Sequence, residues 1–265
     1  MQHNFNNPIY EISINSRECA IVLRVNDIPC FSNFNKGGMA VDWPINPNIL
    51  RSGKQSFLLE IFPYEKEILI NNKAFVELKI AVRDKFDNSK SKILLLEVEP
   101  VCFSKQKENI QYYKIFDVFD AQVPYVNEGW INSMYILEEK KENLIKEIDI
   151  FYDELYHIFK TSDIENYKLK ISERYSELCN SFYLSSLEMK RREVSFIPKF
   201  KGIIKRDNIE KYDLNFYGNG RVVGINIPFE PVALKFSSND EEDNIIYEQA
   251  LFHRKKNESK LSLIR

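Results

Sequence analysis

The sequence predicts an α+β protein with an N-terminal antiparallel β-sandwich, a long antiparallel helical hairpin and a C-terminal antiparallel β-sheet. Three observations lead to this prediction. Residues 9–120 form short apolar runs separated by turn signals, which is typical of a sandwich. The middle of the chain repeats apolar residues every three to four positions, as one face of a helix requires. The last section returns to strand-like runs around an Asn-Gly pair.

The first section is expected to hold its strands between turns. Segment 74–83 shows the clearest alternation, with Val76, Leu78 and Ile80 on one side. Pro44 and Pro47 exclude a central strand where they stand, because proline has no backbone donor. The expected strands are 10–14, 19–25, 30–34, 39–43, 55–62, 74–83, 92–98 and 112–118.

The helical hairpin is expected over about 132–192, a stretch without Gly or Pro. Leu144, Ile148 and Leu155 mark the apolar face of its first helix. Ser162 and Glu165 have the spacing of a capping box and are expected to begin the second helix. So short a join requires two antiparallel helices.

The C-terminal section is expected to contain strands 212–217 and 221–227 around the turn Gly218-Asn219-Gly220. A further strand is expected at 232–236, and a second hairpin from 245–253 and 261–264. The sequence thus divides into a β-sandwich domain, 1–125, and a domain 126–265 that combines the helical hairpin with the C-terminal sheet.

Composition limits the partners. The formal charge of -2 gives no long-range field for nucleic acid. No stretch approaches the ~20 apolar residues of a membrane span. The N-terminus has no basic and apolar leader, so the expected location is the cytoplasm, or the periplasm if a signal peptide had been removed ahead of it. The oligomeric state is left open.

No catalytic or metal-binding pattern stands out. The four cysteines and three histidines lack metal-ligand spacing, and we expect four reduced thiols, with a disulfide as the alternative. A G-x-S-x-G elbow is absent, and Gly218, Gly220 and Gly224 are spaced wrongly for a dinucleotide fingerprint. The prediction is therefore a protein that is not an enzyme and that holds no cofactor and no metal.

Candidate partner-binding residues come from turns and loops. Aromatic and arginine side chains at such places dominate protein interfaces, although ordinary packing explains them too. An acidic loop can pair with a basic surface. There are two alternatives for that loop: it binds calcium, or it is a solvated surface loop without a binding role. The candidates are Trp43, Tyr217, Asn219, Arg221, Asp240, Glu241, Glu242 and Asp243.

Two stretches resemble known families. Residues 25–29, 44–50 and 52–55 resemble galactose-binding-like β-sandwiches and bacterial secretion-associated proteins, with Gln55 where Asn is more usual. Residues 214–223, 251–254 and 263–265 look like the C-terminal part of immunity proteins paired with type VI or other contact-delivered toxins. The two stretches span about a third of the chain. The resemblance implies a non-enzymatic inhibitor that covers the active site of a toxin.

These observations together predict a non-enzymatic binding protein. The leading hypothesis is an immunity protein that neutralises a cognate antibacterial effector by binding and blocking it. The alternative is a carbohydrate-binding or accessory β-sandwich protein, in which Trp43 and other aromatic side chains would stack on sugars.

Overall fold

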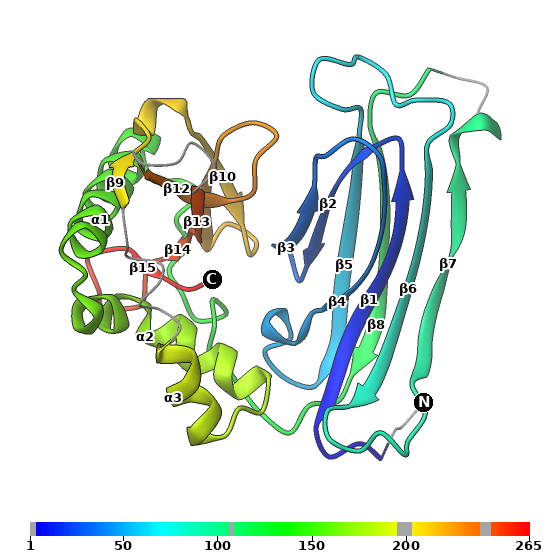
Figure 1. Cartoon of the computed structure of the whole chain (residues 1–265), viewed down its shortest axis with the longest axis horizontal. Coiled ribbons are helices and arrows are strands. Elements are labelled where there is room, and N and C mark those ends of the chain that lie inside the picture. Colours follow the sequence, from blue (N-terminus) through cyan, green and yellow to red (C-terminus); the bar gives the residue numbers. More distant parts are fainter. Residues whose placement is uncertain (1–3, 106–108, 195–202, 239–244) are drawn as a thin grey trace. The chain divides into compact units, whose positions relative to one another are not determined.

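The computed structural model describes residues 4–105, 109–194, 203–238 and 245–265. The chain splits into two compact units, Met1–Asn127 and Glu128–Arg265. The sequence placed this division between residues 125 and 126. We describe each unit by itself and call them unit 1 and unit 2 (Figure 1).

Unit 1 is a sandwich of two antiparallel sheets, as predicted. The first has the order β4-β1-β6-β7 and the second the order β3-β2-β5-β8 (Figure 1). Every strand segment expected from the sequence of this unit is present. In chain order the strands are β1 (Pro8–Arg17), β2 (Ala20–Val25), β3 (Ile28–Asn33), β4 (Gly38–Pro44), β5 (Gly53–Phe62), β6 (Phe75–Asp84), β7 (Ile93–Cys102) and β8 (Tyr113–Ala121).

Alternation along the strands builds the core of unit 1. Ile12 and Ile14 of β1 lie opposite Ile80 and Leu78 of β6, and all four side chains are buried. Successive side chains of a strand point to opposite faces, so every second residue reaches the space between the sheets. The outer face of this sheet is polar instead. Lys79 there forms ion pairs with its neighbours Glu77 and Glu97.

Asn and Gln side chains in residues 25–55 connect the loops of the sandwich through hydrogen bonds. Asn26 donates from Nδ2 to the backbone oxygen of Asn48 (2.8 Å) and to Oε1 of Gln55 (2.7 Å). Asn46 is fully buried, and its Oδ1 accepts from the backbone N–H of Tyr10 at 2.7 Å. A buried polar backbone group needs such a partner. These residues therefore have a structural role inside unit 1.

The described part of unit 2 has three α-helices where the sequence predicted two. They are α1 (Lys141–Thr161), α2 (Ile164–Ser181) and α3 (Ser186–Val194). The expected second helix is broken because Tyr183 takes a positive φ of 52° and the N–H of Leu184 bonds to the carbonyl of Cys179, which ends α2. Ser185 and Glu188 then form a reciprocal capping box that begins α3.

The predicted capping box at Ser162 is wrong. Ser162 closes α1 in the left-handed conformation, with φ 55°. Asp163 is the residue that caps α2, and its Oδ1 accepts from the N–H of Asn166 at 3.1 Å. The reversal of the chain uses Ser162 as a C-cap, so the N-cap moves on by one position.

The first turns of α2 lie against the last turns of α1. The rings of Phe159 and Tyr167 are 5.5 Å apart. Lys170 forms an ion pair with Glu154, and its ammonium lies 4.8 Å from the ring centre of Phe151. These contacts join positions at similar distances before and after the turn, as an antiparallel start of α2 requires.

The residues of unit 2 that the structure describes form two antiparallel sheets where one was predicted. The first has the order β10-β11-β14-β15 and the second the order β13-β12-β9. The expected strand 245–253 divides at Ala250, because its first half pairs with β12 and its second half with β11. The strands are β9 (Ile203–Arg206), β10 (Asp213–Tyr217), β11 (Val222–Asn226), β12 (Ala233–Ser238), β13 (Ile245–Gln249), β14 (Leu251–His253) and β15 (Ser262–Leu263).

The apolar face of α1 covers both sheets of unit 2. Leu144, Ile148 and Phe159 share one core with Phe236 of β12 and Phe252 of β14. Fully burying one such side chain contributes about 1.5–3 kcal/mol. The helix and the two sheets of this unit therefore share one hydrophobic core.

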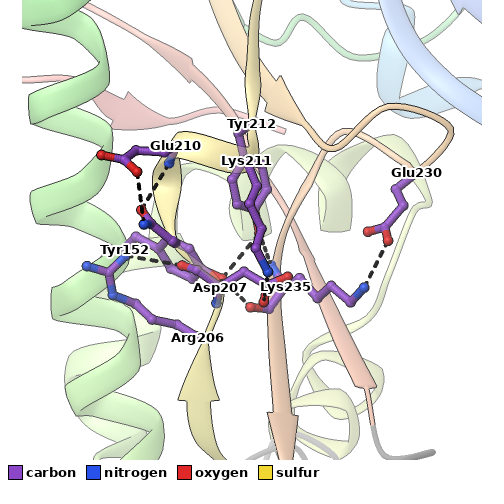
Figure 2. A network of polar contacts seen from close by, with 9 residues as sticks. Tyr152, Arg206, Asp207, Glu210, Lys211, Tyr212, Glu230 and Lys235 are labelled. Atoms are coloured by element: carbon purple, nitrogen blue, oxygen red, sulfur yellow. Dashed lines mark hydrogen bonds and ion pairs between the residues drawn. The ribbon is translucent and has the colours of Figure 1, made fainter.

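A buried tyrosine fixes α1 to its sheet through polar contacts (Figure 2). The hydroxyl of Tyr152 donates to the carbonyl of Lys235 and accepts from the N–H of Asp207 at 3.1 Å. The Tyr212 hydroxyl lies 3.3 Å away and accepts from the Lys235 N–H. Arg206 stacks its guanidinium 4.7 Å from the centre of the Tyr152 ring. Burial raises the pKa of Tyr152, so the hydroxyl stays neutral.

In the ranges described above, no helix is long and apolar enough to cross a membrane. Cys19, Cys30, Cys102 and Cys179 are all free thiols.

Candidate partner-binding surface

The turn between β10 and β11 is mostly enclosed. Gly218, Asn219 and Gly220 all have positive φ, as the sequence suggested for a tight hairpin, and Tyr217 pairs with Val222 across it. Tyr217 is only 5% exposed, and both glycines are buried. Of these turn residues, only Asn219 is exposed to solvent.

A segment without regular structure, 130–137, encloses this turn. A Cβ atom on Gly218 would come within 2.7 Å of Trp130, and one on Gly220 within 2.5 Å of Tyr135. The backbone N–H groups of Ile136 and Leu137 both donate to the carbonyl of Gly220. Both glycines are therefore required for contact as well as for backbone conformation.

Arg221 is also directed into this segment. Its Nη1 donates to the carbonyl of Ser133 at 2.6 Å. The structure thus places Tyr217 and Arg221 where they support the turn, while Asn219 remains at the surface. Trp130 is buried and packs against Gly218 of the same unit.

Three apolar side chains beside the turn are exposed. Met134 is 41%, Tyr135 47% and Leu137 45% exposed, and the last two flank Gly220. We call these three residues together with Asn219 the hairpin-tip surface. Sequence reasoning missed them because it assigned residues 132–137 to the start of a helix. The Gly-x-Gly turn is the signal that could have indicated them. Two glycines so close together have no side chains, and the free space accommodates large side chains from another segment.

The hairpin-tip surface is held in place although its segment is neither helix nor strand. The N–H of Met134 donates to the carbonyl of Arg254 at 2.8 Å. The buried guanidinium of Arg254 in turn forms ion pairs with Glu139 and Glu147, both at 2.9 Å. A surface that is already ordered avoids part of the entropic cost of binding.

The other predicted residues lie elsewhere. Trp43 is on β4 and is 36% exposed; its ring centre lies 4.9 Å from that of Phe31 on β3, with the planes tilted by 52°. The pair closes one side of the sandwich, where two edge strands face each other. Stacking of Trp43 on a sugar stays a prediction. The acidic loop Asp240, Glu241, Glu242 and Asp243 lies outside the described residues.

Ser133, His253 and the half-buried Glu173 form an array next to the segment that carries the hairpin-tip surface. Ser133 Oγ is 2.7 Å from Nδ1 of His253, and Nε2 of His253 is 3.4 Å from Oε1 of Glu173. If the serine hydroxyl donates to Nδ1, the neutral imidazole carries its proton at Nε2, directed at the carboxylate. Nucleophile, base and carboxylate follow this order in hydrolases.

The surroundings of the array favour a structural role. Ser133 and His253 are almost completely buried. A cavity of about 370 Å³ lies between α1, α2 and residues 255–263, and it is lined by Glu173 but by neither Ser133 nor His253. A nucleophile must reach its substrate. The array connects residue 133, α2 and β14 and thereby supports the segment next to it.

Glu173 makes the stability of the folded protein depend on pH. Burial raises the pKa of its carboxyl group, but His253 and Lys255, whose ammonium is 2.6 Å away, lower it by more, so the pKa lies below its usual value. A carboxyl group with a lowered pKa stabilises the folded state. This contribution is complete above the pKa that Glu173 has in the unfolded chain, and it is lost as the pH falls through its pKa in the folded protein.

The Glu173→Gln variant should therefore lose stability relative to the wild type at pH 7, and the difference should shrink below about pH 4. Urea unfolding at both pH values measures this. Glu65→Gln, at an exposed turn position of unit 1, is the control and should show no such difference. An equal effect of both variants would contradict the role of Glu173.

No family model, curated protein or solved structure matches this chain. Among the residues that the structure describes, no group of three or more His, Cys, Asp or Glu side chains is placed to hold a metal ion.

Proposed function

We propose that the protein acts by binding another protein, as an immunity protein that neutralises a cognate antibacterial effector by covering its active site. The hairpin-tip surface carries the proposal, because it presents Met134, Tyr135 and Leu137 on a pre-ordered segment. Aromatic residues and methionine are enriched in the centres of protein interfaces. The sequence resemblance of residues 214–223 to immunity proteins concerns the hairpin around which this surface is built.

The exposed part of this surface is suited to a protein partner. Three large apolar side chains of one segment are each more than 40% exposed, and the exposed Asn219 belongs to the turn that this segment encloses. Exposed apolar patches with a polar rim mark interaction sites. We expect an affinity in the nanomolar range, which corresponds to about -12 kcal/mol.

Co-purification and co-expression with the product of the neighbouring gene test the proposal. The tagged full chain should retain that product on the column, and cells that express both should survive where cells with the effector alone die. No complex together with no protection would refute the proposed function. Binding of the same protein to an array of glycans tests the alternative function, in which Trp43 stacks on a sugar.

A further inference from the structure

Strand β8 is an unprotected edge of the unit 1 sandwich. Proteins usually block edge strands with proline, bulges or irregular pairing. The other three edges have such features: Pro29 in β3, Pro44 in β4 and Pro100 in β7, with register shifts beside β3 and β7. In contrast, β8 has neither Pro nor Gly and pairs with β5 without a break from Tyr113 to Ala121.

The middle of β8 is open on both faces. Phe116 is 64% exposed and Val118 45% exposed, and Asp117 between them is exposed as well. In a strand covered on one face, every second residue would be buried. Both faces therefore remain accessible at residues 116–118, beside the outer backbone edge, where the N–H of Val118 donates to Oδ1 of its neighbour Asp117 at 2.7 Å.

The edge strand of the opposite sheet, β7, is also incompletely covered. Leu96 and Val98 of β7 lie beside Ile80 and Leu78 of β6. The two β6 side chains are fully buried, whereas the two β7 side chains are only partly buried. Beside Leu96 and Val98 the buried core ends at β6, while Val101 near the end of β7 is buried, and β7 lies at one side of the sandwich (Figure 1). A strand added next to β8 would extend the second sheet toward the partly covered face of β7.

The charges on β8 define the chemistry of such a strand. Asp117 and Asp120 are exposed, and neither forms an ion pair with another residue in the described ranges. Lys114 is the basic residue of the strand. Opposite charges directly across an antiparallel pair are favourable, and like charges are not. A partner strand should therefore be basic opposite the aspartates and apolar opposite Phe116 and Val118.

We propose that β8 binds an extended segment of another protein by antiparallel strand addition, and that this segment carries basic and apolar residues. Backbone hydrogen bonds provide affinity in this mode, and side chains provide specificity. A second copy of this chain matches these charges only in part. With Phe116 opposite Val118 of the copy, Lys114 would face Asp120, but the two Asp117 carboxylates would lie side by side. The proposal concerns unit 1 and does not depend on the hairpin-tip surface of unit 2.

A synthetic peptide tests it. The peptide Thr-Lys-Val-Val-Lys-Val-Val-Glu-Thr places lysine opposite Asp120 and Asp117 and glutamate opposite Lys114 in antiparallel register. Its labelled form should bind the full chain in fluorescence anisotropy and should slow amide exchange along β8. The variant Asp117→Lys should bind it about fivefold to tenfold more weakly. A peptide with glutamate in place of the central lysine should recover affinity for that variant.

Glu65→Lys, another exposed acidic position of unit 1, is the matched control and should bind the original peptide like the wild type. The proposal is overturned if the peptide does not slow amide exchange along β8, or if Asp117→Lys and Glu65→Lys weaken binding equally. It is also overturned if the peptide with the central glutamate binds Asp117→Lys no better than the original peptide does. It is also overturned if the full chain dimerises in sedimentation and Phe116→Lys abolishes the dimer, because β8 would then serve a second copy.

Discussion

Replacing Arg174 with methionine is expected to lower the free energy of unfolding by about 3–5 kcal/mol. Arg174 on α2 forms an ion pair with Glu248 on β13, and Glu248 is only 2% exposed. The hydroxyl of the buried Tyr167 donates to the same carboxylate, at 3.1 and 3.0 Å. Without the guanidinium, the carboxylate keeps its burial but loses its charge partner. Urea unfolding followed by circular dichroism measures the loss.

The double variant Arg174→Met with Glu248→Met separates the pair from simple loss of packing. Removing both charges avoids the unpaired carboxylate, so the double variant should be more stable than Arg174→Met alone. If the single and double variants were equally unstable, the cost would come from lost volume, and the buried charge would not be its cause.

Gly220→Ala is expected to lower the free energy of unfolding by about 2–3 kcal/mol, from backbone strain plus overpacking. Gly220 has φ 81°, and the added methyl group would meet the Tyr135 ring at 2.5 Å and Leu137 Cβ at 3.0 Å. The segment must then move, so partner binding should weaken together with stability. Thermal unfolding and titration with the partner measure the two effects.

Gly220→Ala combined with Tyr135→Ala distinguishes contact from conformation. The second substitution removes the ring, so part of the stability should return, while binding stays weak because an exposed aromatic side chain has been lost. If stability did not recover, positive φ alone would explain the effect of Gly220→Ala, and the close contact with Tyr135 would carry none of it.

The sequence predicted the sandwich well because its signal is local. Alternation along 74–83 and the turn signals between the short apolar runs indicate the strands and their faces with no knowledge of distant residues. The α+β class and the apolar face of α1 follow from the same kind of periodicity. Helix ends were less predictable, since Ser162 and Asp163 are both good capping residues and only the conformation of the turn decides between them.

The candidate surface was predictable only in part. The glycines beside Asn219 predicted the turn. The segment 130–137 that encloses this turn lies about 85 positions earlier in the chain, so the sequence did not indicate it. The same limit applies to His253, whose partners Ser133 and Glu173 are each distant in sequence. The division of 245–253 between two sheets also depends on which strands lie beside it, and periodicity does not contain that information.

The central claim is that the hairpin-tip surface binds a protein partner, and a comparison of two leucines tests it most directly. Leu137 is 45% exposed on that surface, and Leu187 is 59% exposed on α3 of the same unit. Calorimetric titration of the partner with Leu137→Glu should show an affinity reduced about thirtyfold or more, equivalent to about 2 kcal/mol. Leu187→Glu should bind like the wild type. Equal affinities for the two variants, with both folded, would contradict the claim.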